Sequence, residues 1–250
     1  MEALKFRKAV LLVSLCLWTL TVFPLVKEDT IFQSDYLLIL NTYTSDAPWS
    51  NAIISPVLQW LNMERKTEVY VENMNMLMID DSLKLADLKT NIFAKYGKKK
   101  PKAVLLLGNS MMLFRNEMRE AWGDVPLILC GEESYMGPDD CYIKKYPVVP
   151  SEQVPLTNFT EEYNLTLLQT RVFIEENVKL LQHMIPGMKK IILIGDGRYV
   201  NQQLNTDMKQ LLQKAYPELE YDFYSAANMT TDSLLLKLNK VDSATTGVLL

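Results

Sequence analysis

Short apolar runs alternate with longer segments of helical period along most of this sequence, and this alternation constrains the fold more than any other feature. The clearest run, 103–107, reads Ala-Val-Leu-Leu-Leu and ends at a glycine. A continuous apolar run of this length is typical of a parallel strand buried on both faces. The preceding segment 82–96 repeats apolar residues at the spacing of an amphipathic helix. The alternation therefore predicts βα units around a parallel sheet.

The pattern runs through the chain twice. We predict a first α/β lobe over 36–150 and a second over 156–250, separated by a stretch rich in Gly, Pro and Tyr without helical period. The expected fold class is α/β, with two Rossmann-like lobes and parallel sheets. The predicted strands are 36–40, 68–72, 103–107 and 126–130, then 190–194, 221–224 and 247–250. Because the last run stands at the chain's end, we expect an incomplete second lobe and a fragment of a longer protein.

Composition excludes several classes of protein. The 250 residues are 48% hydrophobic and 22% charged, which is typical of a globular chain and not of a disordered one. The net charge of −4 leaves no surplus of Lys and Arg for phosphate contacts, so we expect no nucleic-acid partner. The mean hydropathy near zero argues against a protein with many membrane spans.

The N-terminus carries a candidate membrane anchor. Cations within residues 1–8 precede an apolar run, 9–26, whose 18 residues can cross a bilayer about 30 Å thick. Signal peptides usually have a shorter apolar region and a cleavage site between small residues, so we favour an uncleaved transmembrane anchor over a removed signal. The positive-inside rule then places residues 1–8 in the cytoplasm and the chain after residue 26 in the periplasm, at the inner (cytoplasmic) membrane.

Two cysteines lie outside the apolar N-terminal run. Cys130 and Cys141 flank a loop rich in Gly, Pro and Asp, which could close into a disulfide in an oxidising compartment. Two unrelated thiols are the alternative, and the sequence leaves both open.

Few residues suit catalysis or a cofactor. His183 is the only histidine, which argues against a Ser-His-Asp hydrolase and a histidine-rich zinc site. The turn Gly195-Asp196-Gly197 follows a predicted strand but lacks the third glycine of a dinucleotide-binding loop. We predict no catalytic residue, no metal and no cofactor in this chain.

Polar and aromatic residues gather in the loops that follow the predicted strands. The carboxyl ends of parallel strands meet at one edge of a sheet, where open α/β folds bind their ligands. Four loops reach that edge: 41–49, 108–110, 131–135 and 195–199. Their hydroxyls, helix N-termini and aromatic rings could together hold a small polar or zwitterionic molecule. Trp49 and Tyr199 suggest stacking on a flat group, with a place in the core as the alternative.

The order of these loops resembles the type I periplasmic-binding fold, in particular the ABC-transporter substrate-binding-like proteins. The resemblance rests on the loop 41–49 and on the segments Leu107-Gly108-Asn109-Ser110, Pro126-Leu127-Ile128-Leu129-Cys130-Gly131, Ile185-Pro186-Gly187 and Ile192-Leu193-Ile194-Gly195-Asp196. It implies two lobes that close on a small molecule, a change that a membrane helix can transmit. By position it also implies that the cleft is lined by Thr44, Ser45, Asn109, Ser110, Glu133, Asp196 and Tyr199, to which we add Trp49.

With an uncleaved anchor, the chain looks like the extracytoplasmic sensor domain of a two-component membrane histidine kinase of the Bacteroidetes type. The resemblance implies a small-molecule ligand such as an amino acid, a peptide or a sugar, contact with the membrane, and a homodimer. Two alternatives stay open. One is the substrate-binding protein of an ABC transporter, and the other is an exported enzyme that uses Asp196 or Glu133.

Overall fold

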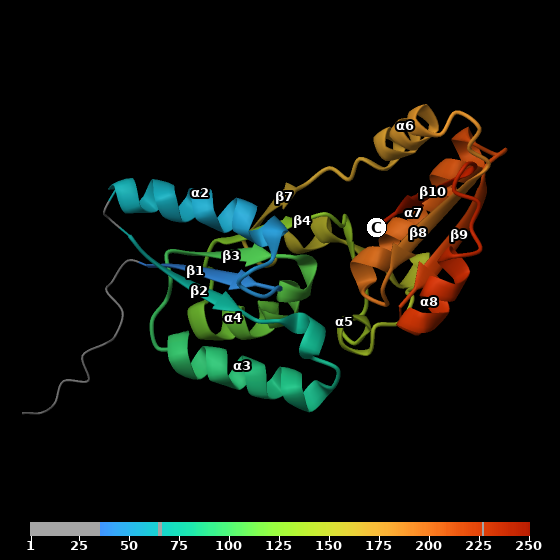
Figure 1. The fold of residues 1–250 in the computed structure, drawn as a ribbon. Helices are drawn as coiled ribbons and strands as arrows, with labels where there is room; N and C mark the ends of the chain where they lie inside the picture. The colour runs from blue at the N-terminus through green and yellow to red at the C-terminus, as the bar shows by residue number, and fades with distance from the viewer. Residues whose placement is uncertain (1–35, 65–66, 227) are drawn as a thin grey trace, which may run out of the picture. The chain divides into compact units, whose positions relative to one another are not determined.

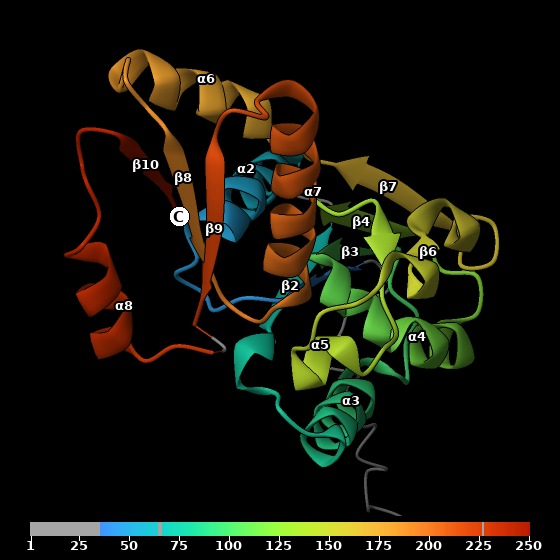
Figure 2. The ribbon, with the colours of Figure 1, turned by 90° about the vertical axis from the view of Figure 1, so that its right-hand side faces the viewer.

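The computed structural model describes residues 36–64, 67–226 and 228–250. The predicted anchor, 9–26, and the predicted cytoplasmic residues 1–8 lie outside these ranges. Within the described ranges, no helix combines the length and the apolar character that crossing a bilayer requires. The described chain is α/β, with two parallel sheets as the sequence predicts (Figures 1 and 2).

The first sheet contains five parallel strands in the order β2-β1-β3-β4-β7. Strand β1 pairs with β2 on one side and β3 on the other, so that Ile39 lies between Val71 and Leu105. The strands are β1 (Tyr36–Asn41), β2 (Glu68–Asn73), β3 (Ala103–Leu107), β4 (Leu127–Gly131) and β7 (Leu165–Gln169). Parallel strands need crossover connections, and the helices in those connections bury both faces of the sheet.

Helices cover the two faces of the first sheet. α2 (Pro48–Glu64) lies on one face, and α3 (Ser82–Tyr96) and α4 (Arg115–Trp122) lie on the other (Figure 1). Successive strand residues point to opposite faces. Ile39 and Leu105 accordingly pack in one cluster with Ile54 of α2. On the other face, the ring of Tyr36 stacks on that of Tyr96 of α3, with centroids 6.3 Å apart.

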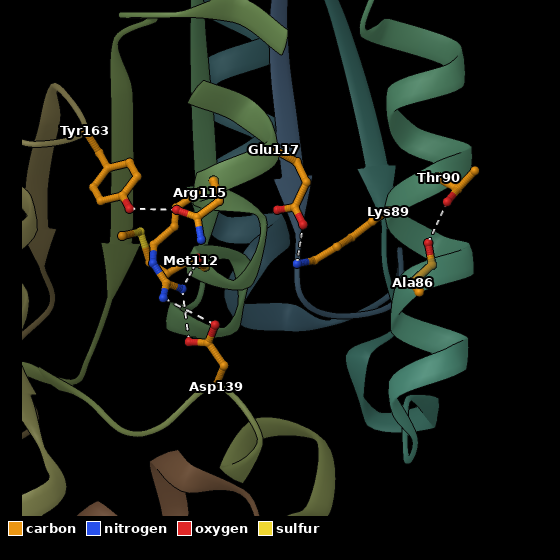
Figure 3. Close-up of polar contacts among 9 residues, drawn as sticks. Ala86, Lys89, Thr90, Met112, Arg115, Glu117, Asp139 and Tyr163 are labelled. Carbon is orange, nitrogen blue, oxygen red and sulfur yellow. Dashed lines mark hydrogen bonds and ion pairs between the residues drawn. The ribbon is translucent and has the colours of Figure 1, made fainter. Parts of the chain in front are cut away.

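Polar contacts fix α4 against its neighbours (Figure 3). The Lys89 Nζ of α3 lies 2.7 Å from the Glu117 Oε1 of α4. At the start of α4, Arg115 donates to both carboxylate oxygens of Asp139, at 3.0 and 3.2 Å, and to the Met112 carbonyl. Asp139 belongs to the segment after β4, so this contact ties that segment to the body of the first sheet.

The remaining short elements connect these layers. The segment between β4 and β7 contains a two-stranded antiparallel pair of β5 (Tyr135–Met136) and β6 (Val154–Pro155), and the short helix α5 (Cys141–Lys144). The short 3₁₀-helices are η1 (Met76–Met78), η2 (Asn109–Phe114), η3 (Pro150–Glu152) and η4 (Leu156–Phe159). The elements between β4 and β6 are too short to produce a helical period, which is why the sequence there shows none.

The second sheet is parallel, with the strand order β10-β8-β9. Its elements are α6 (Ile174–Met184), β8 (Lys190–Gly195), α7 (Tyr199–Ala215), β9 (Glu220–Ser225), α8 (Thr231–Leu238) and β10 (Thr246–Leu249) (Figure 2). Val178 of α6 and Met208 and Leu212 of α7 form one buried cluster with Ile191 of β8. β8 is the central strand of this sheet, because β10 pairs with it on one side and β9 on the other.

The segment that leads into the second sheet differs from the prediction. We expected everything after residue 156 to belong to the second lobe. Instead, β7 adds to the edge of the first sheet, where Leu167 pairs with Leu129 of β4. Thr166 interrupts the leucines of β7, and only Leu165 is buried. The strand therefore lacks the continuous apolar run that identified β3.

Both cysteines are buried and free in the structure. Cys130 packs in the cluster beneath α2, whereas Cys141 begins α5, where its Sγ would lie 2.8 Å from a Cβ at Gly137. Burial raises the pKa of both thiols, to about 12 for Cys141. The disulfide alternative is therefore wrong for this structure, because the two thiols pack in separate environments.

Candidate functional site

A cavity lies at the carboxyl ends of β1, β3 and β4, beside the loop that follows β8. It contains about 620 Å³ of empty space when the part open to solvent is included. The order β2-β1-β3 places a topological switch point between β1 and β3, the position where open sheets bind ligands. The lining residues are Thr42, Tyr43, Trp49, Met76, Leu77, Gly108, Asn109, Ser110, Gly131, Glu132, Glu133, Tyr142, Lys145, Arg198, Tyr199 and Val200.

The loops after β1 and β3 touch at the floor of this cavity. Thr42 and Ser110 share a hydrogen bond of 2.8 Å between their hydroxyl oxygens. Gly108 lies between them with a φ of 92°, and a Cβ there would lie 2.6 Å from Thr42 Oγ1. Only glycine adopts this conformation without strain and leaves room for the threonine.

Asn109 presents an unpartnered oxygen within the wall of the cavity. Its Nδ2 donates to the carbonyls of Glu133 and Tyr135, at 3.4 and 3.5 Å. The side chain is only 2% exposed, and its Oδ1 has no hydrogen-bond partner among the described residues. A Cβ at Gly131 would lie 2.2 Å from that oxygen, so the glycine makes room for it. Buried polar atoms are normally paired, which makes this oxygen a candidate ligand contact.

Two tyrosines form a second part of the wall. The rings of Tyr142 and Tyr199 lie 5.2 Å apart at an angle of 49°. Both hydroxyls are buried and have no partner among the described residues. Burial raises the pKa of both phenols, so they stay protonated and can donate or accept. Two further rings of the lining, those of Tyr43 and Trp49, meet edge to face with their centroids 5.7 Å apart.

The cavity carries charges of both signs. Burial, together with the charge of Glu132, raises the pKa of Glu133 to about 7, although Arg198 acts in the opposite direction. The Arg198 Nε donates to Asp196 Oδ2 at 2.7 Å, and the Arg198 amide donates to Oδ1. Asp196 also accepts from Asn201 Nδ2 at 2.7 Å. The aspartate therefore holds the guanidinium at the cavity rather than lining the cavity itself.

The structure brings five of the eight predicted site residues to this cavity. They are Trp49, Asn109, Ser110, Glu133 and Tyr199. Thr44 and Ser45 are exposed, and their carbonyls accept from the Ala47 amide and from Asn51 Nδ2 in the turn before α2. Thr44, Ser45 and Asp196 are absent from the lining of the cavity. Contact with a ligand stays a prediction for all eight.

Sequence reasoning missed several lining residues. Tyr142 and Lys145 lie in the aperiodic segment after β5, where neither a strand end nor a helical stripe indicated them. Lys145 has a positive φ of 56°, and its Nζ donates to the Leu77 carbonyl at 2.7 Å. Arg198 lies inside the predicted loop 195–199, but the residues predicted to contact a ligand there were Asp196 and Tyr199. The loops were recognisable in sequence, but the choice of side chain within each loop was not.

Among the described residues, no three His, Cys, Asp or Glu side chains are grouped so that they could hold a metal ion.

Comparison with solved structures finds similar folds. No family model and no curated protein matches the sequence. An ABC domain from Streptococcus pneumonia, solved in complex with L-Trp, is similar with a TM-score of 0.54 at 13% identity, over 88% of this chain and 66% of that one. A ligand-free, open substrate-binding protein with adhesive properties from Clostridium difficile has a TM-score of 0.48 at 10% identity, over 86% and 65%.

This chain thus has a periplasmic-binding-protein-like fold of type I. It spans about 65% of the length of the structures that it resembles. At these identities the likeness concerns the fold alone, because one fold supports many functions.

The Tyr199 hydroxyl has no hydrogen-bond partner among the described residues, so its removal should stabilise the protein. We expect Tyr199→Phe to raise the free energy of unfolding of the ligand-free chain by about 1 kcal/mol, because it removes a buried group without a partner. Urea denaturation measures this. Tyr221→Phe is the control, because its hydroxyl donates to Asn205 Oδ1 at 2.8 Å and its loss lowers stability. Equal destabilisation by both changes would contradict an unpaired Tyr199 hydroxyl.

Glu133 predicts a fall in stability as the pH rises. Its pKa is about 7 when folded and about 4.5 when unfolded, so between these values the folded state binds more protons. The free energy of unfolding therefore falls from pH 4.5 to 7. We expect Glu133→Gln to be more stable than the natural chain by roughly 2 kcal/mol above pH 7, less than the full shift implies because solvent screens the group. Urea denaturation across this pH range measures the difference.

The exposed Glu161 supplies a matched control for this pH profile. Glu161→Gln makes the same chemical change on the surface, and its profile should run parallel to that of the natural chain. If Glu133→Gln also ran parallel, Glu133 would not be the group that titrates.

Proposed function

We propose that this chain binds a small zwitterionic molecule in the cavity at the ends of β1, β3, β4 and β8. The observation that carries the proposal is a set of three buried polar atoms on its lining residues that have no hydrogen-bond partner among the described residues: Asn109 Oδ1, Tyr142 OH and Tyr199 OH. Each such atom costs about 1–3 kcal/mol when it is left unpaired. A bound molecule that supplies the missing hydrogen bonds recovers this cost, which favours the occupied state.

The charges support a ligand with both signs. Glu133 and the Asn109 Oδ1 suit a protonated amine, because both accept hydrogen bonds. Arg198 and Lys145 suit a carboxylate at the same cavity. The rings of Tyr43 and Trp49 suit an apolar or flat group. An amino acid fits this arrangement best, followed by a short peptide, and the ABC domain with the similar fold binds L-Trp.

We further propose that the chain is the extracytoplasmic input domain of a sensor histidine kinase at the inner membrane. The cations of residues 1–8 and the apolar run 9–26 support an anchor, with the chain after residue 26 in the periplasm. Ligand binding would then shift an equilibrium between open and closed states, which the anchor of a homodimer transmits to a kinase domain. The alternative is a substrate-binding protein of an ABC transporter, and the likeness to the ABC domain supports it.

Calorimetry with the purified full chain tests ligand binding. The panel contains the common amino acids, dipeptides and sugars, and we expect at least one amino acid to bind with a Kd below about 1 mM. Tyr142→Phe should weaken that binding about tenfold, because it removes a hydrogen-bonding group from the cavity. Tyr221→Phe, outside the cavity, should leave the Kd unchanged. Failure of the whole panel to bind would overturn the proposal.

A fusion experiment tests the proposed location. Alkaline phosphatase joined after Leu250 should be active in a bacterial host, because the enzyme folds only outside the cytoplasm. The fusion should stay with the membrane fraction after a carbonate wash and retain Met1 by mass spectrometry. Active fusion protein that is free in the periplasm and cleaved near Val26 would favour the transporter alternative. An inactive fusion would contradict both placements.

A further inference from the structure

A glycine at the end of β4 leaves open a space that two acceptor oxygens border. Gly131 lines the cavity together with Asn109 and Glu133. A Cβ at Gly131 would lie 2.2 Å from Asn109 Oδ1 and 3.6 Å from Glu133 Oε2. The two oxygens are therefore no farther apart than two N–H···O hydrogen bonds laid end to end, each about 2.9 Å long. One nitrogen of a ligand can donate to both.

A primary ammonium group fits these two oxygens. Asn109 Oδ1 is buried and has no partner among the described residues, whereas the Nδ2 of the same amide donates to the carbonyls of Glu133 and Tyr135. The oxygen is thus the part of this amide that a ligand can pair. An amide oxygen and a carboxylate both accept, and an ammonium carries three donors on one atom. It can satisfy both oxygens at once.

The charge of Glu133 depends on pH near neutrality. The side chain is half-buried, and burial together with the charge of Glu132 raises its pKa to about 7. Below that pH most of the carboxyl groups are protonated and neutral, so they attract a cation weakly. An ammonium beside Glu133 favours the ionised form and therefore lowers its pKa.

The phenols that face Glu133 do not titrate in this range. They are Tyr43 in the loop after β1, Tyr142 of α5 and Tyr199 of α7, and the charge of Glu133 acts on each of them. Burial raises the pKa of all three above the usual value of 10. All three stay neutral near pH 7.

The charged groups around Glu133 are of both signs. Arg198, in the loop after β8, and Lys145, which follows α5, bring positive charges to the same lining. The carboxyls of Glu132 and Asp207 line a neighbouring cavity together with Glu133, and burial raises the pKa of both. These two carboxyls are the rival sources of a proton, and the experiment has to separate them from Glu133.

We propose that the ammonium of the ligand binds between Asn109 Oδ1 and Glu133 Oε2 and replaces the proton of Glu133, so that binding releases this proton to solvent. The O–H bond of the carboxyl breaks, its electron pair stays on the carboxylate, and a buffer base takes the proton. The inference rests on the proposed function, because it needs a zwitterionic ligand in this cavity. It makes Glu133 the residue that selects a free ammonium, and it couples the affinity to pH.

Calorimetry on the full chain counts the protons. Each common L-amino acid is titrated at about pH 6 and about pH 8, in two buffers with different heats of ionisation. For the amino acids that bind, we expect release of about one proton per ligand at the lower pH and almost none at the higher pH. The Kd should be about tenfold lower at the higher pH, because Glu133 is then already ionised.

Glu133→Gln keeps an acceptor oxygen but cannot ionise. This variant should release no proton, and its Kd should be the same at both pH values. Asp207→Asn is the control, because it removes a rival carboxyl that does not line the cavity of Gly131, and it should keep the proton release. Release that persists in Glu133→Gln but is lost in Asp207→Asn or Glu132→Gln would overturn the inference.

A second probe lacks the ammonium. The N-acetyl derivative of each amino acid that binds keeps the carboxylate and the side chain, so it should bind about tenfold more weakly at the higher pH and release no proton. Binding of an amino acid without proton release, and with one Kd at both pH values, would overturn this inference and leave the proposed function standing. If no amino acid binds at either pH, both fail.

Discussion

Parallel pairing of strands that are buried on both faces is the constraint on which the rest of this structure depends. β1 and β3 hydrogen-bond along their whole length, and their apolar side chains leave no exposed face. The strands therefore run in one direction and end at one edge of the sheet. α2 follows β1 on one face and α4 follows β3 on the other, so the two connections leave this edge in opposite directions. The cavity lies at this edge, between the connection after β1 and the connection after β3.

Desolvation makes that space a candidate ligand site. Asn109 follows β3, and its Nδ2 donates to two carbonyls of the segment after β4, whereas its Oδ1 has no partner in the part of the chain that the structure describes. The hydroxyls of Tyr142 and Tyr199 are also buried without a partner among the described residues. Tyr142 belongs to α5, after β5, whereas Tyr199 begins α7. Burial of three such atoms lowers the free energy of unfolding of the ligand-free chain, relative to a chain in which a ligand pairs with them. Differential stabilisation of this kind is what a sensor or a transport protein requires.

Charges of both signs line the cavity. Arg198 donates from its Nε to Asp196 Oδ2, which holds the guanidinium at the cavity. Lys145 also belongs to the lining. Glu132 and Glu133 are part of the same lining, and burial raises the pKa of both carboxyl groups.

Local sequence decided the elements, because apolar periodicity and capping act over a few residues. The runs 103–107 and 190–194 are strands, and α3 covers 82–96 because Asp81 accepts from the Lys84 amide at its N-terminus. The loops that reach the cavity followed from the same pattern, since a parallel sheet ends its strands at one edge. Local sequence could not assign β7, because an edge strand with one buried side chain has no apolar run.

The individual contacts of the site depended on tertiary structure. Asp196 looked like a ligand contact but holds Arg198, and Tyr142 entered the lining from a segment without periodicity. The cysteines were near enough in sequence for a disulfide, yet they pack in different places. In each case, the outcome depends on which distant side chain occupies the neighbouring space. That information lies in packing between elements, whereas periodicity describes only one element at a time.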